Sequence, residues 1–475
     1  MRFLITGLML CVPALAQEAV SYRLRYTPPG GSVQVTLRAP DVSAGPQTLV
    51  IPRAIPMGYG EQPYDRFVGK VAAFAAGGSG LDVSRQDGPR WRLGGGGRRL
   101  ERVEYEVDIA AMEREILGAS DASKVRPGYL GLLGYSVFGY LEGREESRIE
   151  VQVEGPSDWP VFLTLAPRAP PPAGSASAKA ANFYALADSQ IAMGPALRVA
   201  RIEGSPALYT AIYAEGAVDP AVVGRVVREA MDAVSAYFGS TPFPHYTAYL
   251  ELLKPVTPRH SYGFSMEHLD SATFFLAHEG GLTAAAPPQD LARTRFNYAH
   301  HFAHAWIPKR CYSEGYFPFQ WELAPVLDTI WFSEGFGQYA AMAAIADTLP
   351  AAEGARYLQD LVQRRFRSSL AEAPPFIRKM PLVELSRVAS TRYSEDFRTG
   401  RTVFSRGGLM AAEMDQRIRE RTGGGKTLRD ALRHLVEWSA RNRRPFRLEE
   451  LPELLEAGAG VPVREVFDKW LRPLE

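Results

Sequence analysis

Hydrophobic and polar residues alternate along the N-terminal third of the chain. In segments 22–26, 33–37, 103–109 and 149–153, apolar side chains occupy every second position, with polar or charged residues between them. Such alternation places one face of a strand on a core and the other in water, and Gly- and Pro-rich turns separate the runs. The pattern predicts an antiparallel β-sandwich over residues 17–165.

The composition changes after this region. Residues 166–181 (APRAPPPAGSASAKAA) are rich in Pro, Ala and Ser, which is typical of an exposed loop or linker. Beyond them, apolar residues recur every three or four positions, the spacing of a helix with one buried face. The first such helix is predicted to follow Asp219, an N-cap residue with a proline after it, and to end at Gly239.

Helical patterns dominate the rest of the chain. Two helices are predicted between residues 291 and 346, on either side of an aromatic loop at 312–321. After Val403 the pattern is helical almost to the last residue, with breaks at the glycine-rich segments 423–425 and 458–460. The sequence shows no internal repeat of fixed period, so a repeat architecture is not predicted.

The composition excludes several classes of protein. The 475 residues are 46% hydrophobic and 23% charged, with 54 Lys and Arg against 53 Asp and Glu. A disordered chain would have fewer apolar residues and more uncompensated charge, and a nucleic-acid-binding protein that relies on bulk positive charge would be basic. No nucleic-acid partner is therefore expected, and the length suits roughly two to four domains.

The N-terminus has the pattern of a secretory signal. Met1-Arg2 gives a positive start, residues 3–13 are apolar, and small residues follow at the position of a cleavage site. We predict removal of residues 1–16 and a periplasmic or secreted mature protein; the alternative is a buried N-terminal helix. Cys311 is then the only cysteine left, which excludes an internal disulfide. No later segment has the roughly 18 consecutive apolar residues of a transmembrane helix, so none is expected in the mature chain.

Three of the eight histidines lie within five residues: His300, His301 and His304. In a helix, four-residue spacing puts His300 and His304 on one face, where both imidazoles reach one metal ion. Histidine pairs without a metal have the same spacing, so the pair alone leaves both interpretations open. Downstream, Glu334 lies in an aromatic and apolar stretch, where a carboxylate is either the third ligand of a catalytic zinc or a solvent-facing helix residue.

Several segments match the motifs of a known family. HHFAHAWIPKR, which starts at His300, matches HEFFHTWNVKR without gaps, and WFSEGFGQYAA matches LWVAEGFTSYY with Glu334 at the glutamate. GFSMEHLDS, which contains Glu267 and His268, is similar to GGGLEHRNS, and IPRAIPMGYGEQPYDRF matches near the N-terminus. On these segments the chain resembles the glycyl aminopeptidase family of zinc metallopeptidases, which are gluzincins with a thermolysin-like catalytic domain.

The resemblance implies a fold, a cofactor and a set of site residues. The fold is α+β and multidomain, with a thermolysin-like zinc-peptidase domain over residues 182–400 and a C-terminal α-helical region over 401–475, both after the β-sandwich. One zinc ion per chain is implied, bound by three residues: His300, His304 and Glu334. Glu267 would receive the free amino group of a peptide substrate, with His268 beside it. The family's C-terminal PDZ-like module is not expected in this chain.

Two departures from the family concern catalysis. The general-base glutamate of HExxH, which takes a proton from the metal-bound water, is replaced by His301. The family's YYxKG motif, whose tyrosines can donate a hydrogen bond to the oxyanion, is VFSRG here, with Val403 and Phe404 at the tyrosine positions. Loss of an oxyanion donor typically costs about a hundred- to a thousandfold in rate, and loss of a general base about a hundred- to ten-thousandfold.

His301 has three interpretations. It could stand in for the base, since an imidazole can accept a proton. It could be a further metal ligand, although adjacent side chains on a helix diverge by about 100°. With Phe404, it could also fill a site that no longer performs chemistry.

Two functions therefore remain. The first is a zinc aminopeptidase with weakened catalysis that acts on short peptides, with His301 and Glu267 as catalytic residues and Glu267, His268 and Phe404 as substrate-binding residues. The second is an inactive pseudo-peptidase that binds a peptide or protein partner.

Overall fold

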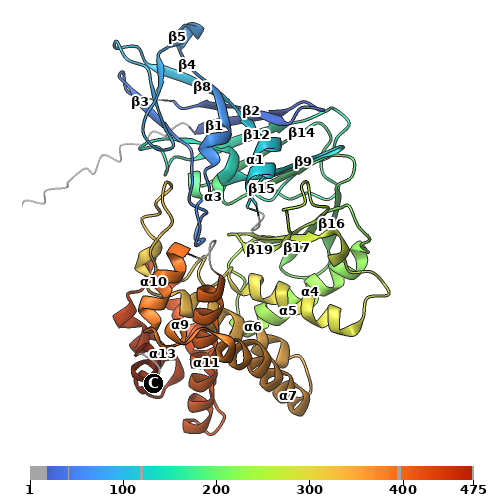
Figure 1. The fold of residues 1–475 in the computed structure, drawn as a ribbon, viewed down its shortest axis with the longest axis vertical. Helices are drawn as coiled ribbons and strands as arrows, with labels where there is room; N and C mark the ends of the chain where they lie inside the picture. Colours follow the sequence, from blue (N-terminus) through green and yellow to red (C-terminus); the bar gives the residue numbers. More distant parts are fainter. Residues whose placement is uncertain (1–18, 41, 118–120, 393–396, 473–475) are drawn as a thin grey trace, which may run out of the picture.

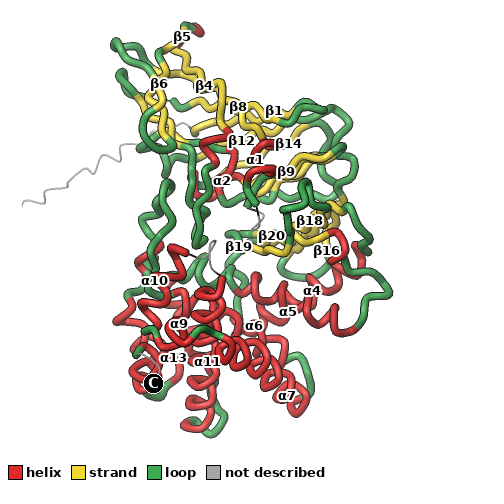
Figure 2. The backbone as a smooth tube through the Cα atoms, in the orientation of Figure 1, coloured by secondary structure: helices red, strands yellow, loops and turns green. Residues whose placement is uncertain are grey.

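The protein has a β-rich N-terminal part and a larger part in which a mixed sheet lies between the β-rich part and a set of helices, as Figure 1 and Figure 2 show. The structure is a computed structural model that describes residues 19–40, 42–117, 121–392 and 397–472. The predicted signal peptide, residues 1–16, lies outside the described residues. Within the described ranges, no helix combines the length and the apolar character that a membrane crossing requires.

The described residues of the N-terminal part form three β-sheets. The largest has the strand order β14-β12-β1-β2-β8-β4-β5, and its neighbouring strands are antiparallel except for the parallel pair β1 and β12. Its strands are β1 Val20–Tyr26, β2 Ser32–Arg38, β4 Val68–Ala75, β5 Gly80–Leu81, β8 Leu100–Asp108, β12 Ile149–Glu154 and β14 Ser175–Ala180. The predicted alternation is confirmed, since residues such as Leu24, Val35 and Val151 are buried in one hydrophobic core.

Two four-stranded sheets complete this part, in the orders β13-β15-β10-β9 and β11-β3-β7-β6. Their strands are β3 Gln47–Val50, β6 Val83–Arg85, β7 Arg90–Leu93, β9 Lys124–Arg126, β10 Tyr129–Leu133, β11 Tyr140–Leu141, β13 Val161–Leu163 and β15 Gln190–Met193. Three short helices join them: α1 Ile109–Glu115, α2 Gly134–Val137 and α3 Phe183–Ala187.

The predicted linker at residues 166–181 is wrong in its second half. Residues 175–180 form β14, which pairs with β12 at the edge of the largest sheet. Ala178 and Ala180 are buried there, because SASAKA places small apolar side chains at alternate positions. The Pro- and Ser-rich composition of the segment hid this alternation, and the β part continues beyond residue 165 through β15.

A five-stranded mixed sheet forms the centre of the molecule. Its order is β16-β17-β18-β20-β19, with β17, β18 and β20 parallel and the edge strands β16 and β19 antiparallel to their neighbours. The strands are β16 Arg198–Ile202, β17 Ala207–Ala214, β18 His245–Leu253, β19 Gly263–Glu267 and β20 Ser271–Ala277. Edge strand β19 carries Glu267 at its end and packs near helix α5.

Helices α4 Pro220–Phe238, α5 Pro288–Ala303 and α6 Gly337–Ala346 pack against one another beside this sheet. The predicted caps of α4 are confirmed: the Asp219 carboxylate accepts hydrogen bonds from backbone N–H groups at the start of the helix, and Gly239 ends it with φ 74°. The helix pair predicted around the aromatic loop is also confirmed, as α5 and α6. The β-sheet and α5 together position the site described below.

The C-terminal part is helical. It comprises α7 Ala351–Leu361, α8 Ser368–Glu372, α9 Pro375–Lys379, α10 Leu382–Arg392, α11 Phe397–Arg421, α12 Leu428–Asn442, α13 Leu451–Ala459 and α14 Arg464–Leu471. The predicted breaks near residues 423 and 460 are confirmed, whereas the predicted boundary at residue 401 falls inside α11 and the run of helices begins earlier. The predicted α+β fold with an N-terminal β domain, a central catalytic region and C-terminal helices is therefore confirmed.

Candidate metal centre

Two imidazoles face each other at the end of α5. His300 lies in the last turn of this helix, and His304 follows its last residue. Their Nε2 atoms are 2.9 Å apart. His304 Nδ1 lies 2.8 Å from the carbonyl oxygen of Ile307, and because a carbonyl only accepts, Nδ1 carries a hydrogen. His304 Nε2 therefore faces His300, and its lone pair is available to a metal ion when the ring is neutral.

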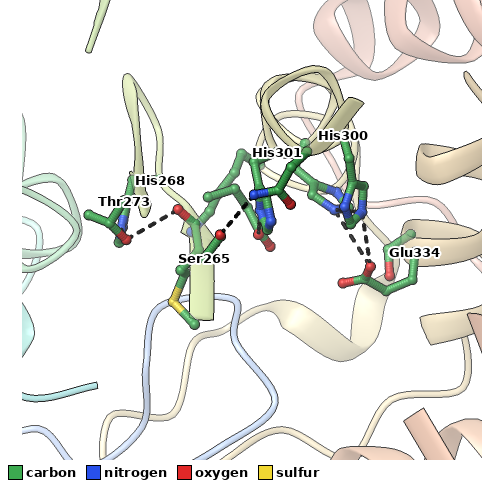
Figure 3. A network of polar contacts seen from close by, with 12 residues as sticks. Ser265, His268, Thr273, His300, His301 and Glu334 are labelled. Carbon is green, nitrogen blue, oxygen red and sulfur yellow. Dashed lines mark hydrogen bonds and ion pairs between the residues drawn. The ribbon is translucent and has the colours of Figure 1, made fainter. Parts of the chain in front are cut away.

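Glu334 completes the cluster from a second element. It lies in a π-helical turn, η5 Trp331–Phe336, directly before α6; π-helical turns are rare and occur frequently at functional sites. Its Oε2 atom is 3.3 Å from His300 Nε2 and 3.6 Å from His304 Nε2. Figure 3 shows the carboxylate pointing at the imidazole pair.

These three side chains fit a zinc ion. In a tetrahedral site with ligand distances of about 2.0–2.1 Å, neighbouring ligand atoms lie about 3.3–3.4 Å apart, close to the separations found here. Two imidazoles and one carboxylate are also a donor set that catalytic zinc uses, with a fourth position left for water or substrate. Among the described residues, His300, His304 and Glu334 are the group that could hold a metal ion.

The electrostatics of two of the three residues favour metal ligation. Burial, with help from the neighbouring His304 and His301, lowers the pKa of His300 to about 3, so this imidazole is neutral, the form that binds a metal. Burial alone would raise the pKa of Glu334, but the imidazoles of His304 and His300 hold it below its ordinary value. The carboxylate is therefore ionised, as a ligand must be. Burial alone would lower the pKa of His304, but the carboxylates of Glu267 and Glu334 raise it to about 9, so metal binding would release a proton from this ring.

Glycines let the surrounding elements approach closely. Gly337 lies nearly one turn after Glu334, and a Cβ there would be 3.1 Å from the Cε1 atom of His304. Gly335 lies against Gly407 of α11, where a Cβ on either residue would overlap backbone atoms of the other element. The sequence GFG after the glutamate thus lets α6 and α11 pack beside the metal ligands.

His301 and Glu267 form a second pair beside the cluster. His301 Nδ1 is 3.5 Å from Glu267 Oε2, and Nδ1 has no hydrogen-bond partner among the described residues. Both residues are buried, and the ring of Phe274 meets the His301 ring edge-on. Burial would raise the pKa of Glu267, but the nearby His304 and His301 imidazoles and the Lys309 ammonium lower it well below its ordinary value, so Glu267 is a buried carboxylate.

The structure does not bring His268 into this group. Its side chain is fully buried, with Nδ1 2.8 Å from Asp188 Oδ1 and Nε2 3.1 Å from Thr273 Oγ1. Figure 3 shows it at the far end of the network from Glu334. Because both ring nitrogens are engaged by protein groups, the predicted substrate contact of His268 is corrected to a structural link between the β domain and the central sheet.

Phe404 lies on α11, the helix that crosses η5. It is buried, and its ring meets Phe397 edge-on at 6.2 Å between centroids. Phe404 therefore lies one turn before Gly407, on a helix next to the metal centre. It is not one of the three residues that could hold a metal ion. Its role in substrate binding stays a prediction.

Sequence reasoning missed one residue of the site, Tyr59. Its hydroxyl lies 3.2 Å from Glu334 Oε1 and 3.1 Å from Ser333 Oγ, and Tyr316 OH is 3.5 Å away. Burial, and then the neighbouring Tyr316 and Glu334, raise the pKa of Tyr59 well above its ordinary value, so the phenol keeps its hydrogen. The one available signal was that Tyr59 lies in the N-terminal segment that matches the family; no periodicity marks it.

Two family models match this chain. The peptidase M61 N-terminal domain matches residues 21–195, and the M61 glycyl aminopeptidase domain matches residues 294–376. Together they cover just over half of the chain, and the second includes the three residues of the metal cluster. No protein of curated function matches significantly.

Solved structures of low sequence identity share the fold. An aminopeptidase N family protein from Idiomarina loihiensis is 17% identical with a TM-score of 0.83, over 96% of this chain and 76% of that one. An M1 zinc metallopeptidase from Deinococcus radiodurans is 15% identical with a TM-score of 0.52, over 97% of this chain and 96% of that one. A mutant of that metallopeptidase, bound to a Tyr-Ser-Ala substrate, is 14% identical with the same TM-score and coverages. The fold of zinc aminopeptidase-type peptidases, the two domain matches and the arrangement of the three ligands agree, and we conclude that this chain belongs to the M61 glycyl aminopeptidase family.

Proposed function

We propose that this protein is a secreted zinc metallopeptidase that removes N-terminal residues from short peptides, with catalysis weakened by His301. The cluster of His300, His304 and Glu334 carries the proposal, because its three ligand atoms converge with the spacing of a catalytic zinc site. Family and fold are those of zinc aminopeptidase-type peptidases. A solved neighbour of the same fold is described as bound to a peptide substrate.

Each side chain of the site has a separate task in this proposal. When bound, zinc would supply an activated water and polarise the scissile carbonyl. Glu267, a buried carboxylate at the end of edge strand β19, suits the free amino group of a peptide, since a buried carboxylate requires a cationic partner. His301 lies between this carboxylate and the metal ligands, the position from which a base would accept a proton.

The His301–Glu267 pair explains why the rate would be low. The imidazole of His301 lies beside the Glu267 carboxylate, which should receive the substrate amine, with 3.5 Å between Nδ1 and Oε2. A substrate must compete with this contact. With Nδ1, the nitrogen nearer Glu267, carrying the ring hydrogen, Nε2 would be the nitrogen that accepts a proton.

The same observation favours one alternative function. If the imidazole stays paired with Glu267 and accepts no proton, the cluster would still hold zinc and a peptide carbonyl could still bind, but turnover would be absent. The protein would then be a pseudo-peptidase that binds a peptide or protein. Turnover of Gly- and Ala-amides by the zinc-loaded protein separates the two functions, because only the peptidase releases amine in proportion to enzyme concentration.

We expect the purified protein to hold about one zinc ion per chain. At free zinc about 100 times Kd, binding to the folded state alone adds about 2.7 kcal/mol to the free energy of unfolding, so EDTA should lower the unfolding midpoint. Metal analysis after refolding with excess zinc measures the content. Glu334→Gln should lose the metal, whereas the exposed control Glu314→Gln should keep it; wild-type protein without retained zinc would contradict the proposal.

The first residues of the chain support export. The charged start, the apolar run 3–13 and the small residues before Gln17 support cleavage after Ala16. Expressed with its first residues in a bacterium, the protein should be recovered from the periplasm or medium, and N-terminal sequencing should begin at Gln17. A cytoplasmic protein that retains the apolar run would contradict secretion without affecting the proposed chemistry.

A further inference from the structure

We propose that Tyr59, a residue of the N-terminal β domain, is a positioning residue for Glu334. It would orient the carboxylate so that only one of its oxygens binds the metal ion. This inference rests on the proposed zinc site and adds a component that comes from the other domain. The hydroxyl of Tyr59 would hold Glu334 Oε1 so that Oε2 alone faces the two imidazoles. The metal centre would then be complete only when the β domain is docked.

The carboxylate of Glu334 has its two oxygens in different surroundings. Oε2 lies 3.3 and 3.6 Å from the imidazole nitrogens of His300 and His304, whereas Oε1 lies 3.2 Å from Tyr59 OH. A carboxylate only accepts, so the phenol donates its one hydrogen to Oε1. The Tyr316 hydroxyl, 3.5 Å away, can in turn donate to Tyr59.

The segment that presents Tyr59 is held from several sides. The backbone N–H of Ala54 donates to the carbonyl of Trp321 at 3.0 Å, and the Lys309 ammonium donates to the carbonyl of Pro56 at 2.8 Å. Lys309 Nζ also lies 3.3 Å from each carboxylate oxygen of Asp188. These contacts tie the segment after β3 to the chain that leaves the zinc helix, and in Figure 1 a blue loop descends from the β domain toward the centre of the molecule.

Two features show that the segment containing Met57 and Tyr59 extends into the second domain. Met57 and Tyr59 are buried in the hydrophobic core of the second part, although the residues on either side in sequence belong to the core of the β domain. Met57 has φ 55°, a left-handed conformation that costs a residue with a side chain about 1–2 kcal/mol. Such strain persists only where surrounding contacts enforce it and is concentrated at functional sites.

The consequence concerns metal affinity. Groups that hydrogen-bond a ligating carboxylate orient it, and their loss typically weakens metal binding about 10- to 100-fold. Without the phenol, Glu334 would be free to rotate and present both oxygens or neither. The β domain therefore contributes to the metal centre through one hydroxyl group.

Tyr59→Phe tests this inference, because it keeps the ring and removes only the donor. We expect zinc affinity, measured by competition with a chromophoric chelator, to fall about 10- to 100-fold. With Co²⁺ in place of zinc, the visible absorption bands should change, since they report coordination number and geometry. The matched control is Tyr64→Phe, which also removes a buried hydroxyl from the β domain, one that donates to the carbonyl of Asp121 at 2.7 Å.

The results of these measurements either support or contradict the role of Tyr59. A selective loss of affinity in Tyr59→Phe, with an altered cobalt spectrum and an unfolding midpoint in EDTA equal to that of the wild type, supports it. Equal zinc affinity in Tyr59→Phe and the wild type, or equal losses in Tyr59→Phe and Tyr64→Phe, overturns it while leaving the proposed function intact. A wild-type protein that binds no zinc overturns both.

Discussion

Replacing His301 by glutamate is expected to raise the hydrolysis of Gly- and Ala-amide substrates by at least about a hundredfold, the lower end of what a general base contributes. Position 301 directly follows the first ligand, His300, on α5, which is where HExxH peptidases carry the carboxylate that accepts the proton from the metal-bound water. The other parts of the metal centre are already in register, since the ligand atoms of His300, His304 and Glu334 converge.

The substitution acts in two ways that a second variant separates. Removing the imidazole frees Glu267 to receive the substrate amine, and the new carboxylate adds a proton acceptor. His301→Gln has the shape of His301→Glu, removes the same imidazole from Glu267 and has no basic group. The ratio of kcat/KM between the two variants therefore reports the base alone, provided that metal analysis shows equal zinc content.

A negative result would be informative about the rest of the site. If His301→Glu binds zinc and is no faster than His301→Gln, proton transfer is not the missing function. The absence of a hydroxyl at Val403 and Phe404, where the family has tyrosines, would then limit the reaction, and the pseudo-peptidase alternative would be favoured. Equal turnover by the wild type and His301→Glu would instead show that the imidazole is already an adequate base.

The elements that could be predicted from sequence are those encoded by local patterns. Helix α4 was predicted from its own residues, because Asp219 and Gly239 satisfy its ends and its valines share one face. The β-sandwich was predicted in the same way from alternation. Strand β14 was missed because its alternating residues are alanines, which bury little apolar surface, and its strand character depends on pairing with β12.

The metal centre was predicted only in part, for a related reason. Four-residue spacing on one helix brings His300 and His304 together without knowledge of the fold, and the resemblance supplied Glu334. His268 and Tyr59 depend on contacts across more than 70 residues of sequence, to Asp188 and to Glu334 respectively. Such contacts leave no periodic signal, so sequence reasoning placed His268 at the substrate and overlooked Tyr59.

A substitution at the point where α11 crosses η5 closely is expected to have a large effect on stability. Gly407→Ala is expected to lower the free energy of unfolding by at least about 3 kcal/mol, the upper end of typical overpacking costs. The added Cβ would overlap the carbonyl group of Trp331, which is backbone and cannot rotate away. The helix propensity of alanine exceeds that of glycine by about 1 kcal/mol, so the steric cost must also cancel this gain.

The same substitution should weaken zinc binding, because relief of the overlap requires η5 to move away from α11, and Glu334 lies on η5. Urea unfolding with and without zinc measures both effects, and the zinc-dependent gain in stability should shrink in Gly407→Ala. Gly69→Ala is the control: Gly69 is an exposed residue of β4 with no atom within 4 Å of an added Cβ, so its stability should change by no more than about 0.5 kcal/mol. A Gly407→Ala protein as stable as this control, with unchanged zinc affinity, would show that the two helices can separate without disturbing the carboxylate.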